Sequence, residues 1–188
     1  MSKLETNTID NISGSSTLTI GDSNTSTITL KSGATLTNFP ANTPAFYAGG
    51  TTQTNVSTDT FTKAQFDSEE FDTAGNYDHS TNYRFTPTTA GKYFLFANIA
   101  LDASSSNYES GFVSIYKNGS QLYEVTNQQT NNNANHINVF IQIVEDANGS
   151  SDYFEVFAKC TDSSGSPAIN AGGGARRTTF GGYKLIGV

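Results

Sequence analysis

The chain has 188 residues, of which only 14% are charged, while Ser, Thr and Asn together make up about a third. Its formal net charge of -7 argues against nucleic-acid binding, because affinity for phosphates comes from Lys and Arg, of which it has only ten. It has neither the ~18 consecutive apolar residues of a membrane span nor an N-terminal apolar stretch typical of a secretory signal. Since 12% of the residues are aromatic and the single cysteine, Cys160, cannot form an internal disulfide, we expect a folded chain stabilised by packing or oligomerisation.

The first part of the chain is a small repeat in which apolar residues alternate with Thr. Residues 16–20, 26–30 and 34–37 read Ser-Thr-Leu-Thr-Ile, Ser-Thr-Ile-Thr-Leu and Ala-Thr-Leu-Thr. Each unit has too few apolar side chains to offset an ordering entropy of ~1–2 kcal/mol per residue. Identical chains wound around one axis would supply the missing contacts and form a stalk; the alternative is a pair of hairpins on the main domain. In the stalk, the inward residues would be Leu18, Ile20, Ile28, Leu30 and Leu36.

The segment 38–44 contains two prolines and is the predicted junction between two parts. Residues 1–43 are expected to be an anchor or stalk, and residues 44–188 a globular head.

From Gly49 onward, no stretch repeats with the 3.6-residue period of a helix. Short runs of aromatic and β-branched residues alternate with turn-forming clusters, which predicts an all-β head. Asn118-Gly119 is typical of a tight hairpin turn, because both residues tolerate positive φ. Strands are predicted at 91–102, 111–117, 121–126, 136–145, 152–161 and 177–188. The segments 127–135 and 165–174 have few apolar residues and are predicted loops.

A pattern of aromatic residues and glycine runs through the first half of the head, and a second motif closes the chain as Thr179-Phe-Gly-Gly-Tyr-Lys-Leu185. The first pattern consists of Phe66, Asp72, Tyr77, Phe85, Gly91, Tyr93 and Leu95. Together they resemble the globular head of complement component C1q and its tumour-necrosis-factor-like relatives. This sequence has one extra residue between Tyr77 and Phe85, and Leu95 stands where the family usually has Phe.

The resemblance covers roughly residues 44–188. It implies a ten-stranded antiparallel jelly roll that assembles as a homotrimer. The expected core positions of the head are Phe66, Tyr77, Phe85, Gly91, Tyr93, Leu95, Phe180, Gly182 and Leu185.

Two predicted strands carry apolar residues on both faces, which a sandwich with one face in water would not favour. A second buried surface is therefore implied, and the trimer would supply it. We place some of the residues Phe94, Phe96, Tyr153 and Phe157 at the threefold interface between copies.

The N-terminal repeats, joined to such a head, resemble virion fibre and decoration proteins of tailed phages. The phrase Thr-Leu-Thr-Ile-Gly-Asp-Ser-Asn-Thr at residues 17–25 carries most of this likeness. The resemblance implies a location on the surface of a virion, with residues 1–43 bound to other virion proteins.

Few residues suggest chemistry. His79 and His136 have no metal-ligand partner at a recognised spacing, and Cys160 is expected to be a buried, inert thiol. The acidic run 67–72 could supply oxygen ligands to calcium, but it lacks the spacing of a calcium loop, and a solvated loop is the alternative. Arg176-Arg177 after three glycines suggests an anion site or simply a loop that closes onto the last strand. Tyr108 is expected in a recognition loop.

We therefore expect no enzyme, no cofactor and no metal. The leading hypothesis is a homotrimeric structural protein of a phage virion, namely a fibre, head fibre or capsid decoration, with an outward head that could attach to the host surface. The alternative is a glycan- or receptor-binding adhesin module, whose loops, such as 127–135, would hold the ligand. A polysaccharide hydrolase would need two carboxylates across a cleft, and the sequence identifies no such pair.

Overall fold

The computed structural model describes residues 32, 41–54, 56–103, 108–129, 134–163, 165–172 and 176–187. The chain divides into two compact units, Met1–Phe39 and Pro40–Val188, with the division four residues before the expected boundary. The expected stalk positions Leu18, Ile20, Ile28, Leu30 and Leu36 lie outside the described residues. The described strands all belong to the second unit.

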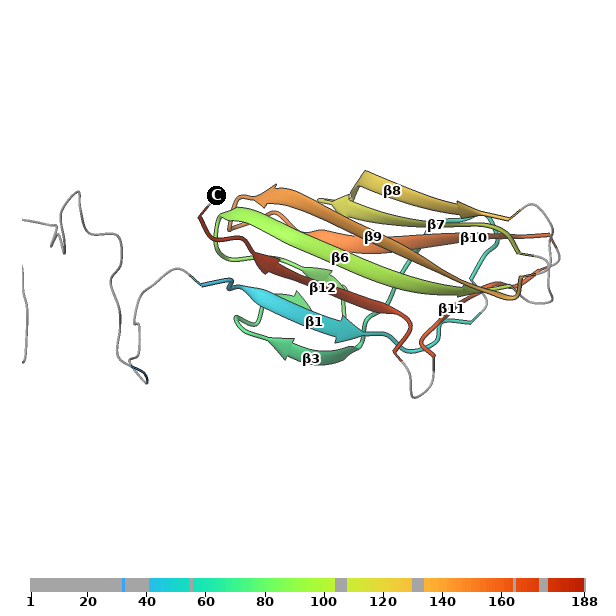
Figure 1. Ribbon diagram of the computed structural model, residues 1–188, viewed down its shortest axis with the longest axis horizontal. Coiled ribbons are helices and arrows are strands. Elements are labelled where there is room, and N and C mark those ends of the chain that lie inside the picture. Colours follow the sequence, from blue (N-terminus) through green and yellow to red (C-terminus); the bar gives the residue numbers. More distant parts are fainter. Residues whose placement is uncertain are drawn as a thin grey trace, which may run out of the picture. The chain divides into compact units, whose positions relative to one another are not determined.

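Sheet A is antiparallel, and its strands lie side by side in the order β9, β6, β12, β1, β3 (Figure 1). A short additional strand, β11, pairs with the end of β6. The strands are β9 (His136–Ala147), β6 (Gly91–Asp102), β12 (Thr179–Lys184), β1 (Ala45–Gly49), β3 (Ser68–Asp72) and β11 (Ala168–Asn170).

Sheet B is also antiparallel and has the order β4, β5, β10, β7, β8, with β2 paired to β10. Its strands are β4 (Tyr77–Asp78), β5 (Arg84–Phe85), β10 (Phe154–Asp162), β7 (Tyr108–Lys117), β8 (Ser120–Gln128) and β2 (Thr62–Lys63). The described residues thus form an all-β, antiparallel jelly roll, with twelve strand segments where ten were expected.

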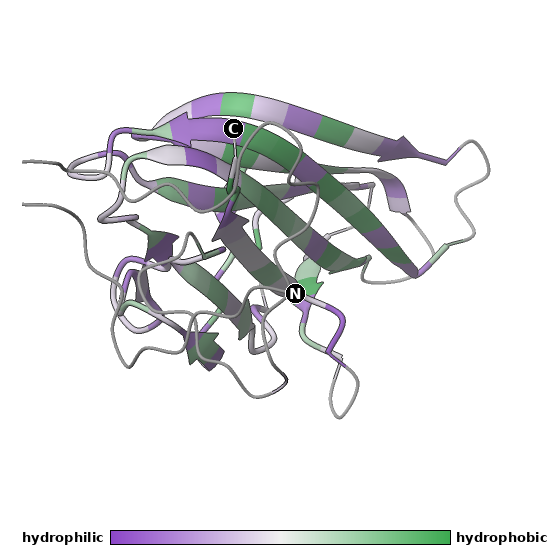
Figure 2. Cartoon of the chain, turned by 60° about the vertical axis from the view of Figure 1, so that its left-hand side comes forward, coloured by the Kyte–Doolittle hydropathy of each residue, from purple (hydrophilic) through white to green (hydrophobic). Residues whose placement is uncertain are grey.

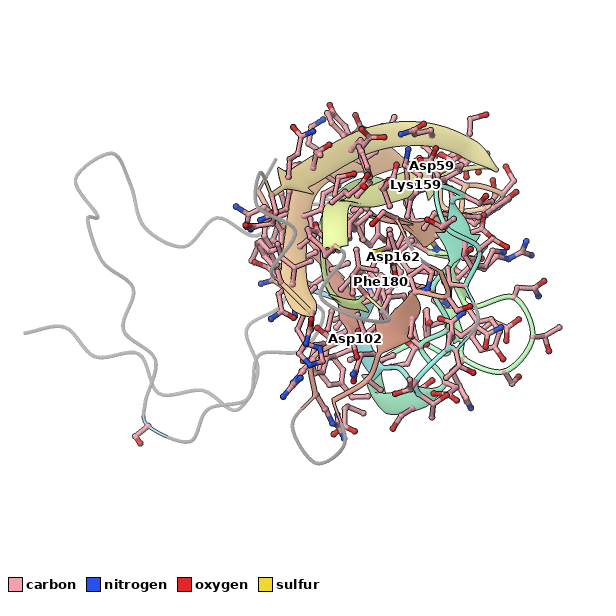
Figure 3. All side chains as sticks on the ribbon, turned by 90° about the vertical axis from the view of Figure 1, so that its right-hand side faces the viewer. Asp59, Asp102, Lys159, Asp162 and Phe180 are labelled. Carbon is pink, nitrogen blue, oxygen red and sulfur yellow. The ribbon has the colours of Figure 1, made fainter. Side chains whose placement is uncertain are left out.

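The core follows from the two-residue alternation of the strands. Along β6 the side chains of Tyr93, Leu95, Ala97 and Ile99 are fully buried, while the residues between them point to the opposite face of sheet A. Phe180 of β12 lies in the interior (Figure 3). Hydrophobic segments run along the strands of both sheets (Figure 2), so the core is the space between the sheets.

The long predicted strands are present, and their bounds agree to within a few residues except at the last one. That strand was expected to span 177–188, but β12 runs only from Thr179 to Lys184. The segments β1, β2, β3, β4, β5 and β11 were not predicted as strands.

Both predicted loops are partly wrong. The segment 165–174 contains β11, where Ile169 is fully buried and its backbone pairs with that of Gln53. In the segment 127–135, Asn127 and Gln128 belong to β8. The prediction for Tyr108 is also wrong, because this residue begins β7 and is fully buried. Its hydroxyl donates to the Asn127 carbonyl at 2.8 Å, which lets a polar ring enter the core.

Most of the expected core positions are buried, and two are not. Gly91 and Leu185 are only half-buried. Leu185 follows the last residue of β12, and its backbone N–H donates to the Lys92 carbonyl at 2.8 Å, so it lies past the end of the sandwich. Gly91 has a φ of +146°, and a Cβ there would lie 2.7 Å from Cε of Lys184. This position therefore requires glycine for its backbone conformation and not for packing in the core. The buried positions are Phe66, Tyr77, Phe85, Tyr93, Leu95, Phe180 and Gly182.

Candidate functional site: the outer face of sheet A

The outer face of sheet A carries a continuous row of aromatic rings from four strands. The ring centroids of Phe71 and Tyr47 are 6.4 Å apart, and those of Tyr47 and Phe96 are 6.2 Å apart. Phe94 lies 5.9 Å from Phe96 and 5.5 Å from Tyr183. These five side chains, which we call the aromatic row, all lie on the side of the sheet away from the core.

A glycine makes this arrangement possible. Gly181 of β12 lies between β6 and β1, and a Cβ there would lie 2.5 Å from Cζ of Phe96 and 3.0 Å from Cδ2 of Tyr47. Because glycine has no side chain, the two rings approach each other across the strand.

The edge strand β9 extends the apolar face. Phe140 and Val144 are each 49% exposed, and Val144 is paired with Phe94 in the register of β6 and β9. Phe71, at the other edge of the sheet, is 50% exposed. A solvated antiparallel sheet face is normally polar, so an exposed apolar face of this extent is typical of an interaction surface.

The outer face of sheet B also has aromatic rings, but cations lie over them. The Lys159 ammonium lies 4.0 Å from the centroid of the Phe112 ring and 5.3 Å from that of Phe61. The same ammonium pairs with the Asp59 carboxylate at 3.2 Å (Figure 3). These cations suit a face that remains in water.

The two faces divide the residues that were predicted to share one interface. Phe94 and Phe96 belong to the aromatic row. Phe157 lies on the outer face of sheet B, 4.1 Å from Tyr116, and Tyr153 packs under the Arg84 guanidinium at 4.5 Å. The outer faces of the two sheets point in opposite directions, so the four predicted residues lie on two different faces of the head.

No cation lies over any ring of the aromatic row, as far as the described residues extend. This difference between the faces favours sheet A as the surface that another molecule covers. Of the four predicted residues, Tyr153 and Phe157 have a cation over their rings, whereas Phe94 and Phe96 have none in the described part of the chain.

A second exposed apolar surface lies at the neighbouring edge of sheet B. On β8, Tyr123 is 51% exposed and Val125 is 40% exposed. β8 and β9 are the edge strands of their sheets, and they contact each other on the same side of the sandwich. This pair of strands therefore presents an apolar edge next to the outer face of sheet A.

The acidic run 67–72 has protein partners. Both carboxylate oxygens of Asp67 accept hydrogen bonds from Thr51, at 2.9 and 2.7 Å. Asp72 accepts from the backbone of Ala74 and Tyr77, while Glu70 pairs with Arg176. These contacts occupy groups that were considered as calcium ligands or, for Arg176, as an anion site.

Each histidine contacts a carboxylate. His79 Nδ1 is 3.2 Å from Glu69 Oε2, and His136 contacts the Asp102 carboxylate. Among the described residues, no group of three His, Cys, Asp or Glu side chains could hold a metal, and no pocket is found.

Cys160 is fully buried, and burial, together with the nearby Asp162 and Asp102, raises the pKa of its thiol to about 12. A thiol with this pKa is not a nucleophile at neutral pH.

The described residues also include no helix with the length and hydrophobicity to span a bilayer.

Sequence reasoning found two members of the aromatic row and missed Tyr47, Phe71 and Tyr183. The strand β1 was not predicted, so Tyr47 had no face assigned to it. Tyr183 belongs to the closing motif, and only its alternation with the buried Phe180 and Gly182 could have placed it on the outer face.

Comparisons with solved structures show the same fold. The globular domain of zebrafish complement 1qA protein matches with a TM-score of 0.51 and 12% identity, over 76% of this chain and 98% of that chain. Murine APRIL, in a crystal structure at pH 5.0, matches with a TM-score of 0.50 and 11% identity, over 75% and 98%. No family model matches the sequence, and no curated protein matches it.

Proposed function

We propose that this chain is a non-enzymatic structural protein of a phage virion whose head self-associates, as a homotrimer, through the outer face of sheet A. The observation that carries the proposal is the aromatic row, over which no cation lies in the described part of the chain. Burying such side chains is favourable at roughly 25 cal/mol per Å² of apolar surface removed from water.

Two different apolar surfaces support self-association rather than binding of an unrelated partner. One is the aromatic row, and the other is the edge formed by β8 and β9, where Tyr123 and Val125 of β8 are exposed. In our proposal the edge of one copy packs on the aromatic row of the next. Contacts between two different surfaces generate a closed ring if the rotation between copies closes. The resemblance to C1q and tumour-necrosis-factor-like heads supports a ring of three.

The virion role rests on the N-terminal repeats and their likeness to phage fibre and decoration proteins. Each repeat has too little apolar surface to fold as a lone unit, so association of three heads would bring three copies of residues 1–43 together. We propose that this segment binds other virion proteins. The outer face of sheet B would remain in water, available to a host-surface glycan or receptor.

Incorporation into particles tests the virion role. A chain shortened to residues 40–188 should keep the folded, associated head but fail to join particles that lack the native protein. Residues 1–39 fused to an unrelated trimeric head should join them. If the shortened chain is incorporated normally and the fusion is not, the anchor assignment is wrong. If the full chain joins a particle and neither the shortened chain nor the fusion does, residues 1–39 and the head are both needed for attachment. If the full chain itself joins no particle, the virion role is wrong.

A further inference from the structure

Gln142 places a side-chain amide within the apolar outer face of sheet A. Residues of β9 alternate between the core and this face: Val139, Ile141 and Ile143 are buried, whereas Gln142 is exposed. Its neighbours along the outer side of the strand are Phe140 and Val144. Across the pair of strands, Gln142 is in register with Phe96 of the aromatic row.

The Gln142 amide has no hydrogen-bond partner among the described residues, unlike the amide of Asn98 on the neighbouring strand, which donates its N–H to the Arg177 carbonyl. The outer row of β9, from His136 to Asp146, contains one other amide, Asn138. It lies next to His136, so apolar side chains do not flank it on both sides. A carboxamide has two N–H donors and an acceptor oxygen. When a second copy covers this face, water no longer reaches Gln142, and only a group of that copy can satisfy the amide.

The charged groups of the same outer row lie farther along β9. Asp146 pairs with Lys92 at 2.9 Å toward one end of the strand, and His136 contacts Asp102 at the other end. Each of these groups has a partner within its own chain. Gln142 is thus the polar group of this row that is flanked by apolar side chains and lacks a partner in the described part of the chain.

We propose that Gln142 determines the specificity of self-association: its amide is hydrogen-bonded to the neighbouring copy and fixes how copies are aligned and how many assemble. The inference rests on the proposed interface on sheet A. A buried amide in an otherwise apolar interface reduces stability but excludes alignments that leave it unpaired, as a single Asn does in coiled coils. An all-apolar face would tolerate several alignments.

The test compares Gln142→Glu and Gln142→Leu with matched changes at Gln128, an exposed residue of β8. Its side chain points away from those of Tyr123 and Val125, toward the outer face of sheet B, which stays in water in the proposed assembly. Mass is measured by light scattering across a dilution series at pH 8 and pH 4. The wild-type chain should give one associated species at both pH values. Gln142→Glu should associate at least tenfold more weakly at pH 8, where its carboxylates are charged, and recover at pH 4, because an unperturbed Glu titrates near pH ~4.3. Gln142→Leu should remain associated but form a mixture of assemblies with different masses.

The outcomes separate the two proposals. If the wild-type chain is monomeric, the sheet A interface is wrong, and this inference falls with it. If the wild-type chain associates, Gln142→Glu behaves like Gln128→Glu at pH 8, and Gln142→Leu keeps a single mass, the interface stands and the role of Gln142 is wrong. Circular dichroism of each variant verifies that the head is folded.

Discussion

At the scale of single residues, Phe180 shows how the sandwich is held together. Its ring is fully buried and lies 4.9 Å from Phe46, edge to face, and 5.5 Å from Phe66. Phe46 belongs to sheet A, and Phe66 comes from the connection before β3. The ring therefore joins segments that are far apart in the sequence.

Removing this ring should strongly destabilise the fold. Phe→Ala changes at buried sites cost about 3–5 kcal/mol, because the transfer energy is lost and a cavity remains. We expect Phe180→Ala to lower the free energy of unfolding by this amount in a urea titration. Ile186→Ala, at a residue that is 48% exposed, is the control and should have little effect. Equal midpoints for the two variants would refute the placement of Phe180.

The hydrogen bonds that Asp78 accepts predict that the stability of the fold depends on acid pH. Its Oδ1 accepts from the backbone of Thr81 at 2.9 Å and of Ser80 at 3.1 Å, and its Oδ2 accepts from the Asn82 amide at 2.7 Å. These hydrogen bonds, first among them that of Thr81, hold the pKa of Asp78 well below its usual range. The stabilisation is fully present above the unfolded pKa of about 3.9 and is lost as the pH falls below it.

Asp78→Asn should therefore reduce the loss of stability between about pH 4 and pH 2. The measurement is the melting temperature of both chains at a series of pH values. At neutral pH the variant should melt lower than the wild-type chain, because the charged acceptor is gone. Parallel acid profiles for the two chains would show that the turn at Asp78 does not contribute.

The aromatic positions of the pattern could be predicted because their side chains are large and their spacing is fixed by strands and turns. Phe66, Phe85 and Tyr93 are fully buried. Leu185 could not be placed correctly, because nothing in its local sequence marks where β12 ends. That end depends on the pairing of Leu185 with Lys92, a residue of another strand.

At the scale of elements, length decides what the sequence reveals. β6 and β9 each have twelve residues, enough for alternation to be recognised, and β6 has the predicted bounds. β2, β4 and β5 have two residues each, and β11 has three. Such short strands are defined by their partners in the sheet, so local sequence carries too little information to predict them.

The functions of the two outer faces could not be separated for a similar reason. Both β6 and β10 carry apolar residues on two faces, and nothing in the local sequence distinguishes the surroundings of Phe96 from those of Phe157. The distinction comes from residues distant in sequence: Lys63, from β2, pairs with Glu155 at 2.5 Å and lies 5.7 Å from the centroid of the Phe157 ring. No such group covers Phe96 in the described part of the chain. The site on sheet A therefore emerges only when both sheets are assembled.

At the scale of the whole molecule, the proposed association covers the outer face of sheet A and leaves that of sheet B in water. The two faces offer a matched pair of changes, since Phe94 and Phe157 are both half-buried aromatic residues on outer faces. A charge in place of Phe94 would have to be buried between copies. A charge in place of Phe157 would stay in water in the proposed assembly.

The most direct measurement is the mass in solution of the full chain, Phe94→Asp and Phe157→Asp at micromolar concentration, by light scattering. We expect about 60 kDa, three times the chain mass of 20.1 kDa, for the full chain and for Phe157→Asp, and a folded 20.1 kDa species for Phe94→Asp. A folded wild-type chain of 20.1 kDa would contradict the proposed association, as would an assembly that Phe157→Asp disrupts and Phe94→Asp leaves intact.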